Sequence, residues 1–199
     1  MRTPFKILIT GLLGTVAFIV AQEVMVTRGL EPKTIPEQKG SGVEPNIGIS
    51  SNNRSSVAKL LNTLLADEYL LYVKTQNYHW NVTGLMFNDL HLFFGKQYNE
   101  LSFIIDMVAE RVRALGGHAL GSMSSFIKNS RLKEQADTVP SDREMLRNLL
   151  NDHEAIIQVI RNDIDSSMNE FQDEGTANLL SDLITRHEKM AWMLRAYIS

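Results

Sequence analysis

Two histidines and two carboxylates are the residues of this sequence with the clearest potential for chemistry. His79 and His91 stand on either side of Gly84 in the stretch NYHWNVTGLMFNDLH. Asp106 and Glu110 are four residues apart, so on a helix they share one face within about 6 Å of each other and can share a cation. Imidazole nitrogen and carboxylate oxygen are both common metal ligands. The four residues are therefore a candidate metal-binding set.

Composition narrows the chemistry further. The chain has 199 residues, of which 44% are hydrophobic, enough to bury one sizeable core. Because cysteine is absent, disulfides, thiolate catalysis, zinc-thiolate sites and iron-sulfur clusters are excluded. Any bound metal must be held by histidine and carboxylate. The net charge of -3 gives no general electrostatic reason for binding nucleic acid.

The first fifty residues differ in composition from the rest. Residues 1–22 are similar to a secretory signal peptide or short anchor, and an anchored protein would contact the membrane through the uncharged run 7–22. That run of 16 residues is shorter than the about 20 that a membrane span needs. An extension from a wrongly chosen start codon, or a helix docked on the body, are the alternatives. Residues 23–50, rich in proline and glycine, predict a flexible linker before a domain over 51–199.

The domain from residue 51 onward has a helical pattern throughout. Apolar residues recur at spacings of three, four and seven, which is typical of amphipathic helices. Ser141 and Glu144 form a capping-box signature at the start of the third long helix. The sequence predicts three long helices and one short one over about 54–80, 90–115, 142–168 and 123–128. The stretch FQDEGT then predicts a break, and a fourth long helix follows it with apolar residues from 179 to 194.

These elements indicate an all-α protein with the ferritin-like four-helix bundle. The segment between the second and third long helices is long, polar and irregular, and carries the short helix. If this connection crosses the bundle, the topology is up-down-down-up. Two antiparallel helices joined at Gly84 would then bring the rings of His79 and His91 together.

The carboxylates cannot join these histidines within one chain. Asp106 follows His91 by 15 residues on the same predicted helix, which is about 22 Å at 1.5 Å per residue. No single ion spans that distance. If all four residues bind one metal, the carboxylates must come from a second subunit across a two-fold axis, which builds two equivalent sites per dimer.

Each of the five histidines, taken singly, is more often structural than functional. An iron site in the middle of a ferritin-like bundle needs Glu-x-x-His on two helices. No histidine here has a glutamate three residues before it. The sequence therefore gives no reason to expect iron in the bundle interior.

Residues from about 46 to 198 resemble the Dps family, the DNA-protection-during-starvation proteins or mini-ferritins. The resemblance covers the whole helical body, and the spacing His-x11-His-x14-Asp-x3-Glu matches the ferroxidase motif of that family. The segments that carry it are KTQNYHWNVTG, FNDLHLFFGKQYNEL, DMVAERVRALGG and DEGTANLLSDLITRHEKMAWMLRAYI.

The resemblance implies a stress-response ferroxidase and iron store. Members form hollow homododecamers whose two-fold interfaces hold the sites, with His79, His91, Asp106 and Glu110 as the matching iron ligands here. Ferrous iron is oxidised preferentially by hydrogen peroxide, and a ferric mineral is stored inside. A cytoplasmic location is implied, with a membrane-anchored or exported form as the alternative. Trp80, next to His79, is expected either to donate electrons that quench radical by-products or to pack at the dimer interface.

Two positions depart from the family pattern. Gly95 stands one helical turn after His91, where the family usually has an acid, which predicts a weak second metal position. Asn178 replaces an acid at the start of the last helix, where acidic residues line an iron-entry pore in the family. The remaining pore candidates are Asp173, Glu174 and Asp182, for which a solvated acidic turn is the alternative.

Direct DNA binding is expected to be weak or absent. Members that coat DNA use a tail rich in lysine and arginine, because affinity comes from phosphate neutralisation. The segment 22–48 has three basic residues against four glutamates. Two alternatives to a ferroxidase stay open: a DNA-binding structural particle with little enzymatic activity, and an exported or tethered bundle whose iron site has decayed through Gly95.

Overall fold

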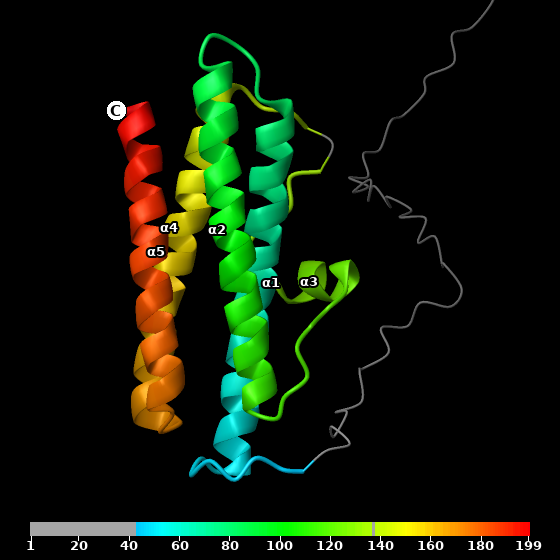
Figure 1. Cartoon of the computed structure of the whole chain (residues 1–199), viewed down its shortest axis with the longest axis vertical. Coiled ribbons are helices and arrows are strands. Elements are labelled where there is room, and N and C mark those ends of the chain that lie inside the picture. Colours follow the sequence, from blue (N-terminus) through cyan, green and yellow to red (C-terminus); the bar gives the residue numbers. More distant parts are fainter. Residues whose placement is uncertain (1–42, 137) are drawn as a thin grey trace, which may run out of the picture. The chain divides into compact units, whose positions relative to one another are not determined.

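The computed structural model describes residues 43–136 and 138–199, and these form an all-helical bundle (Figure 1). The expectations for residues 1–22, and for most of the linker, lie outside the described residues. No strand occurs among the described residues, so the all-α prediction is confirmed. The elements are α1 (Ser51–Asn81), α2 (Phe87–Ala114), α3 (Met123–Asn129), α4 (Asp142–Asp165), the π-helical turn η1 (Ser166–Glu170) and α5 (Glu174–Ile198).

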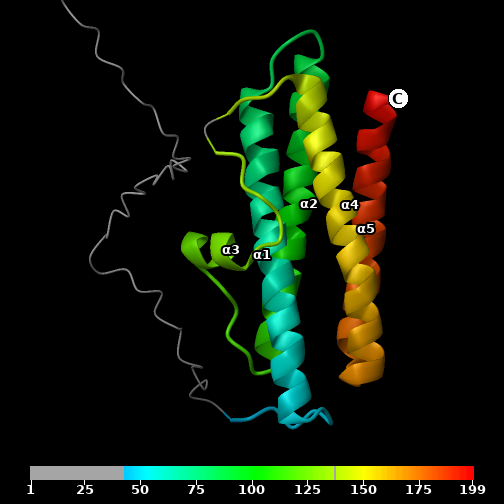
Figure 2. The same cartoon turned by 180° about the vertical axis from the view of Figure 1, so that it is seen from behind.

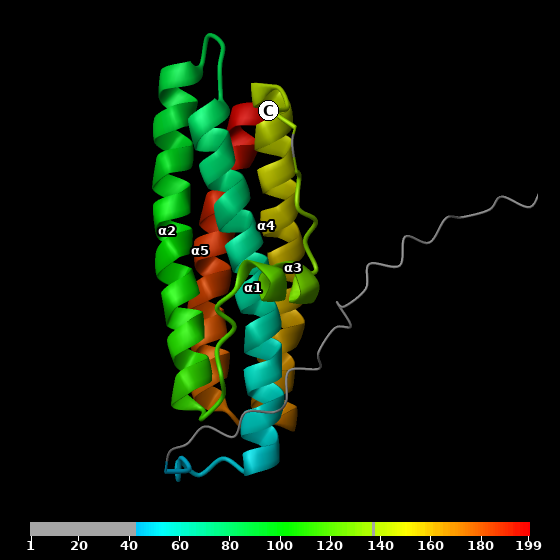
Figure 3. The same cartoon turned by 90° about the vertical axis from the view of Figure 1, so that its right-hand side faces the viewer.

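The four long helices have the predicted up-down-down-up order. α1 and α2 form one antiparallel hairpin, and α4 and α5 form a second (Figure 1). The connection between α2 and α4 returns along α1, so that α2 and α4 begin at the same end of the bundle (Figure 2). The short helix α3 packs beside α1 on this side (Figure 3). In the part of the chain that is described, no helix is long and apolar enough to cross a membrane.

Capping residues explain where the helices begin. Ser50 accepts a hydrogen bond from the backbone of Asn53 at the start of α1. The capping box of Ser141 and Glu144 is present at the start of α4, as predicted. Asp173 caps α5, which therefore begins at Glu174, close to the expected helix start at GTAN.

The third long helix ends sooner than predicted. Its α-helical hydrogen bonding stops at Asp165, and the expected last turn to 168 is the π-helical turn η1. The chain then reverses at Gln172, whose φ of 55° lies in the left-handed region. The break that the stretch FQDEGT predicts is thus confirmed, with a different helical geometry before it.

The core runs the length of the bundle between the two hairpins. Each long helix contributes fully buried leucines, among them Leu61, Leu101, Leu149 and Leu183. Burying one such side chain stabilises the fold by roughly 1.5–3 kcal/mol relative to leaving it in water. This apolar packing fixes the rotation of α1 and α2, and so decides which of their residues face each other at the turn.

Candidate metal centre

His79 and His91 form a stacked pair at the end of the α1–α2 hairpin. Their ring centroids are 3.8 Å apart with an interplanar angle of 21°. His79 Nδ1 lies 2.6 Å from the carbonyl oxygen of His91, and His91 Nδ1 lies 2.8 Å from the carbonyl oxygen of His79. The prediction that the turn brings these two rings together is confirmed.

These reciprocal contacts fix the tautomer of both rings. A carbonyl oxygen can only accept a hydrogen bond, so each Nδ1 must carry the hydrogen. In the neutral imidazole the lone pair is then on Nε2, the atom that a metal would bind. Histidines that ligate metals are commonly oriented in this way, through a hydrogen bond from the other ring nitrogen to a carbonyl or carboxylate.

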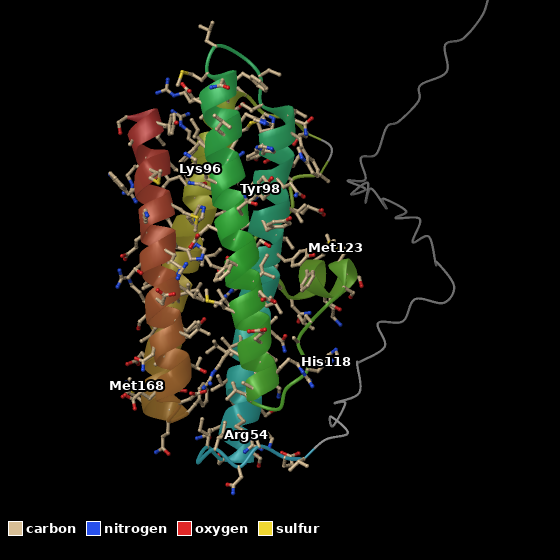
Figure 4. The ribbon with its side chains drawn as sticks, in the orientation of Figure 1. Arg54, Lys96, Tyr98, His118, Met123 and Met168 are labelled. Atoms are coloured by element: carbon tan, nitrogen blue, oxygen red, sulfur yellow. The ribbon has the colours of Figure 1, made fainter. Side chains whose placement is uncertain are left out.

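Gly95 lets the His79 ring lie close to α2. A Cβ built at this position would lie 3.3 Å from both Cε1 and Nδ1 of His79, closer than most such contacts in proteins. The ring thus occupies the space that a side chain at position 95 would need. On the same helix Tyr98, labelled in Figure 4, meets the His79 ring edge-on with a centroid distance of 5.1 Å.

Asp106 and Glu110 are exposed on α2, well along the helix from the histidines. Both belong to the same unbroken helix as His91, so the separation of about 22 Å expected from helix rise applies. Among the described residues no three histidine or acidic side chains come together as a ligand set. The histidine pair and the carboxylate pair are therefore two separate groups on one chain.

A surface hollow of about 440 Å³ lies beside Asp106. Tyr69 and Tyr72 of α1 form part of its wall, and Phe103 of α2 borders it with 64% of its surface exposed. An aromatic ring that is exposed next to a carboxylate and a hollow is the kind of surface that another protein chain covers.

Trp80 and the three acidic candidates lie in different environments. Trp80 is 66% exposed, next to His79 in the sequence. Asp173 is 1% exposed and accepts hydrogen bonds from Arg111 and Thr176, so its carboxylate belongs to the α5 cap and is not available to line a pore. Glu174 is exposed, while Asp182 is exposed and paired with Arg186 one turn later.

The sequence did not predict the structural roles of Tyr98 or of the His153–His187 pair. The contact of Tyr98 with His79 follows from the register of the hairpin, in which Tyr98 also faces Tyr72. His153 and His187 are completely buried and hydrogen-bonded to each other, and His187 contacts Glu68. Their positions on the apolar faces of two predicted helices were the available signal.

Comparison with known proteins identifies the fold and the family. A family model described as a ferritin-like domain matches residues 58–199. The chain is 49% identical to a low temperature-induced protein of a Nostoc species over 77% of this chain and 86% of that protein. It is 37% identical to the DNA protection during starvation protein of Brevibacillus brevis, over 71% of this chain and 94% of that protein.

Solved structures of Dps proteins lead to the same family. The Dps protein of Vibrio cholerae superposes with a TM-score of 0.74 at 32% identity, covering 79% of this chain and 99% of that chain. DpsC of Streptomyces coelicolor gives a TM-score of 0.76 at 31% identity, covering 79% of this chain and 91% of that chain. With its bundle, its histidine pair and these relatives, the chain belongs to the Dps family of ferritin-like proteins.

Proposed function

We propose that this protein is a ferroxidase and iron store that oxidises ferrous iron, preferentially with hydrogen peroxide, at sites between subunits of a hollow homododecamer. One observation carries the proposal: His79 and His91 orient each other through their Nδ1 atoms and leave both Nε2 atoms for a metal. Family membership supports the wider role in iron storage and DNA protection.

The donor set fits iron as a substrate. Two neutral imidazoles offer nitrogen ligands, while Asp106 and Glu110 supply negative charge that favours the ferric product over the ferrous substrate. Oxidation of two ferrous ions by one hydrogen peroxide consumes two protons and yields two ferric ions and two waters. A site with few protein ligands leaves coordination positions for the peroxide.

The second subunit supplies the missing half of each site. The four residues are split into two half-sites too far apart for one ion, and an isologous contact across a two-fold axis would place each pair against its complement. The exposed Phe103 and the hollow beside Asp106 support such a contact on the α1–α2 face. Trp80, exposed next to His79, would either donate an electron to a radical by-product or pack in this interface.

Iron entry involves fewer acids than the sequence suggested. Of the three pore candidates, Glu174 and Asp182 keep carboxylates at the surface, whereas Asp173 is buried in the α5 cap. The pore of this protein would therefore be weakly acidic, in keeping with Asn178. Entry of ferrous iron should then depend less on ionic strength than through a pore with more acids.

A DNA-binding structural particle with little ferroxidase activity is the alternative function. Names of relatives such as the Brevibacillus brevis protein refer to DNA protection. The net charge of -3 and the four glutamates among residues 22–48 argue against direct coating of DNA by this chain. Protection by removal of ferrous iron and peroxide needs no DNA contact.

A paired assay on one preparation tests the two functions. Ferrous oxidation is followed at 25 °C with stoichiometric peroxide and separately with air, and a DNA gel shift is run at physiological salt. We expect faster oxidation with peroxide, its near-complete loss in His79→Ala and in Asp106→Ala, and no gel shift. Rapid oxidation that survives both substitutions would refute the site, and a gel shift without oxidation would favour the structural particle. Circular dichroism checks that the helices remain.

A further inference from the structure

Three titratable side chains form a hydrogen-bonded triad in the middle of the bundle, away from the candidate metal centre. His187 of α5 has its Nε2 2.9 Å from Glu68 Oε1 of α1 and its Nδ1 2.9 Å from His153 Nδ1 of α4. All three residues are completely buried. The triad therefore connects the α4–α5 hairpin to α1 through the core.

The geometry limits how many protons the triad can hold. The carboxylate of Glu68 accepts, so His187 donates from Nε2. Between the two Nδ1 atoms there is room for one hydrogen, because one nitrogen must donate and the other accept. One of the two imidazoles is consequently neutral. If both became imidazolium, two N–H groups would point at each other across 2.9 Å.

Beyond Glu68, the described residues around the triad offer no unpaired carboxylate for a second imidazolium. Nε2 of His153 has no hydrogen-bond partner among the described residues. Gln97 is the buried polar residue of α2, and it is uncharged.

The carboxylates of the adjoining turns already lie near basic side chains. On the α1 and α4 side, Asp152 pairs with Lys74, and Asp67 pairs with Arg131, which also lies 3.9 Å from Asp163. On the α2 and α5 side, Arg186 pairs with Glu100 and Asp182. Glu188 of α5 pairs with Arg161, and Glu154 of α4 pairs with Arg195.

We propose that this triad is an acid-sensitive link in the fold, which holds α4, α5 and α1 together while one imidazole is neutral and separates when both are protonated. Its separation exposes the core between the two hairpins. The proposal concerns the stability of the bundle and is independent of the iron chemistry.

The direction of the pH dependence follows from burial. Burial, and to a lesser extent the neighbouring His187, hold the pKa of His153 well below 6.5 in the folded protein. In the unfolded chain the pKa of a histidine returns to about 6.5. The contribution of neutral His153 to the free energy of unfolding is therefore fully present above about pH 6.5 and is lost as the pH falls below that value. Each pH unit below about 6 reduces the folding equilibrium constant about tenfold for one proton.

Urea unfolding of the full-length protein between pH 7.5 and 5 tests the proposal. The variant His153→Asn puts an amide nitrogen close to the position of Nδ1 and cannot titrate. Below about pH 6, we expect the folding equilibrium constant of the wild type to fall with each pH unit by about tenfold more than that of His153→Asn. The matched control is His118→Asn, which changes an exposed histidine in the connection after α2 (Figure 4) and should keep the wild-type slope.

Parallel pH slopes for the wild type and His153→Asn would overturn the proposal. If His153→Asn does not fold, hydrogen exchange on the wild type is measured in place of the urea comparison. Amides of α4 and α5 around the two histidines should lose protection between pH 7 and 5.5, after correction for intrinsic exchange, while amides at the centre of α2 keep theirs. Unchanged protection of α4 and α5 over this range would likewise overturn the proposal.

Discussion

His79 and His91 hold each other in position through two reciprocal hydrogen bonds, each from a ring Nδ1 to the other residue's backbone carbonyl oxygen, at 2.6 and 2.8 Å. The pair is therefore pre-oriented on one chain before any metal binds. The carboxylates of Asp106 and Glu110 have no comparable contact with it, because they lie farther along the same helix. In the proposed function, completion of the site would thus depend on assembly.

Mixing two inactive variants tests this dependence directly. One variant has His79→Ala and His91→Ala, and the other has Asp106→Ala and Glu110→Ala. Each alone should be inactive. After joint unfolding and reassembly, half of the randomly paired dimers are mixed and contain one complete site, so about a quarter of wild-type peroxide-dependent oxidation should return.

The control for this experiment is the size of the reassembled particle. Light scattering should give the same mass for both parents, the mixture and the wild type. A mixture that reaches full size yet stays inactive would rule out a site built from two subunits. A site built within one chain cannot be restored by mixing, because every chain lacks half of the ligands.

Substitution of Gly95 by alanine should raise the stability of the fold while weakening iron binding. Replacing a glycine in a helix interior by alanine contributes about 0.5–1 kcal/mol to stability, reduced here by the 3.3 Å contact of the new Cβ with His79. The contact should also move the ring and weaken iron binding roughly tenfold, the lower end for disturbed support of a metal ligand. Urea unfolding and ferrous titration measure the two effects. Unchanged affinity would show that the ring position tolerates a side chain.

A matched control for Gly95→Ala is Lys96→Ala, the next residue along α2. Lys96 is exposed, and Figure 4 labels it on that helix. Its replacement should leave iron affinity unchanged, since alanine and lysine have similar helix propensities. Loss of affinity in both variants would point to a general effect on α2 and not to contact with His79.

Removal of residues 1–42 should leave an assembled particle with wild-type oxidation rates. The bundle begins after them, and Arg54 keeps its bonds to the carbonyl oxygens of Ile49 and Leu115. Gel filtration and the peroxide assay give the result, and an insoluble or monomeric product would show that these residues take part in the fold. A further cut through Glu44 removes its ion pair with Arg54, but Glu44 is mostly exposed, so the cost should stay within about 1 kcal/mol.

The sequence by itself determined the helical class, the division at Gly84 and the candidate ligands. These features are local or periodic. Apolar spacing of three and four predicts amphipathic helices, and the capping box of Ser141 and Glu144 predicts the start of α4, which the structure contains. Helix rise alone separated His91 from Asp106, because the distance along a helix depends only on residue count.

Tertiary packing decided what each side chain contacts. The stacking of His79 on His91, the contact of Tyr98 and the space left by Gly95 depend on the rotation of α1 against α2. Asp173 is acidic like the other pore candidates, yet Arg111, distant in sequence, makes it part of a buried cap.

The Glu68–His187–His153 triad shows the same limit most clearly. Its members are separated by 85 and 34 residues along the sequence and have no spacing motif in common. Only the packing of the two hairpins brings them into contact. Side-chain register across a bundle results from the fit of all apolar faces at once, so no single segment contains it.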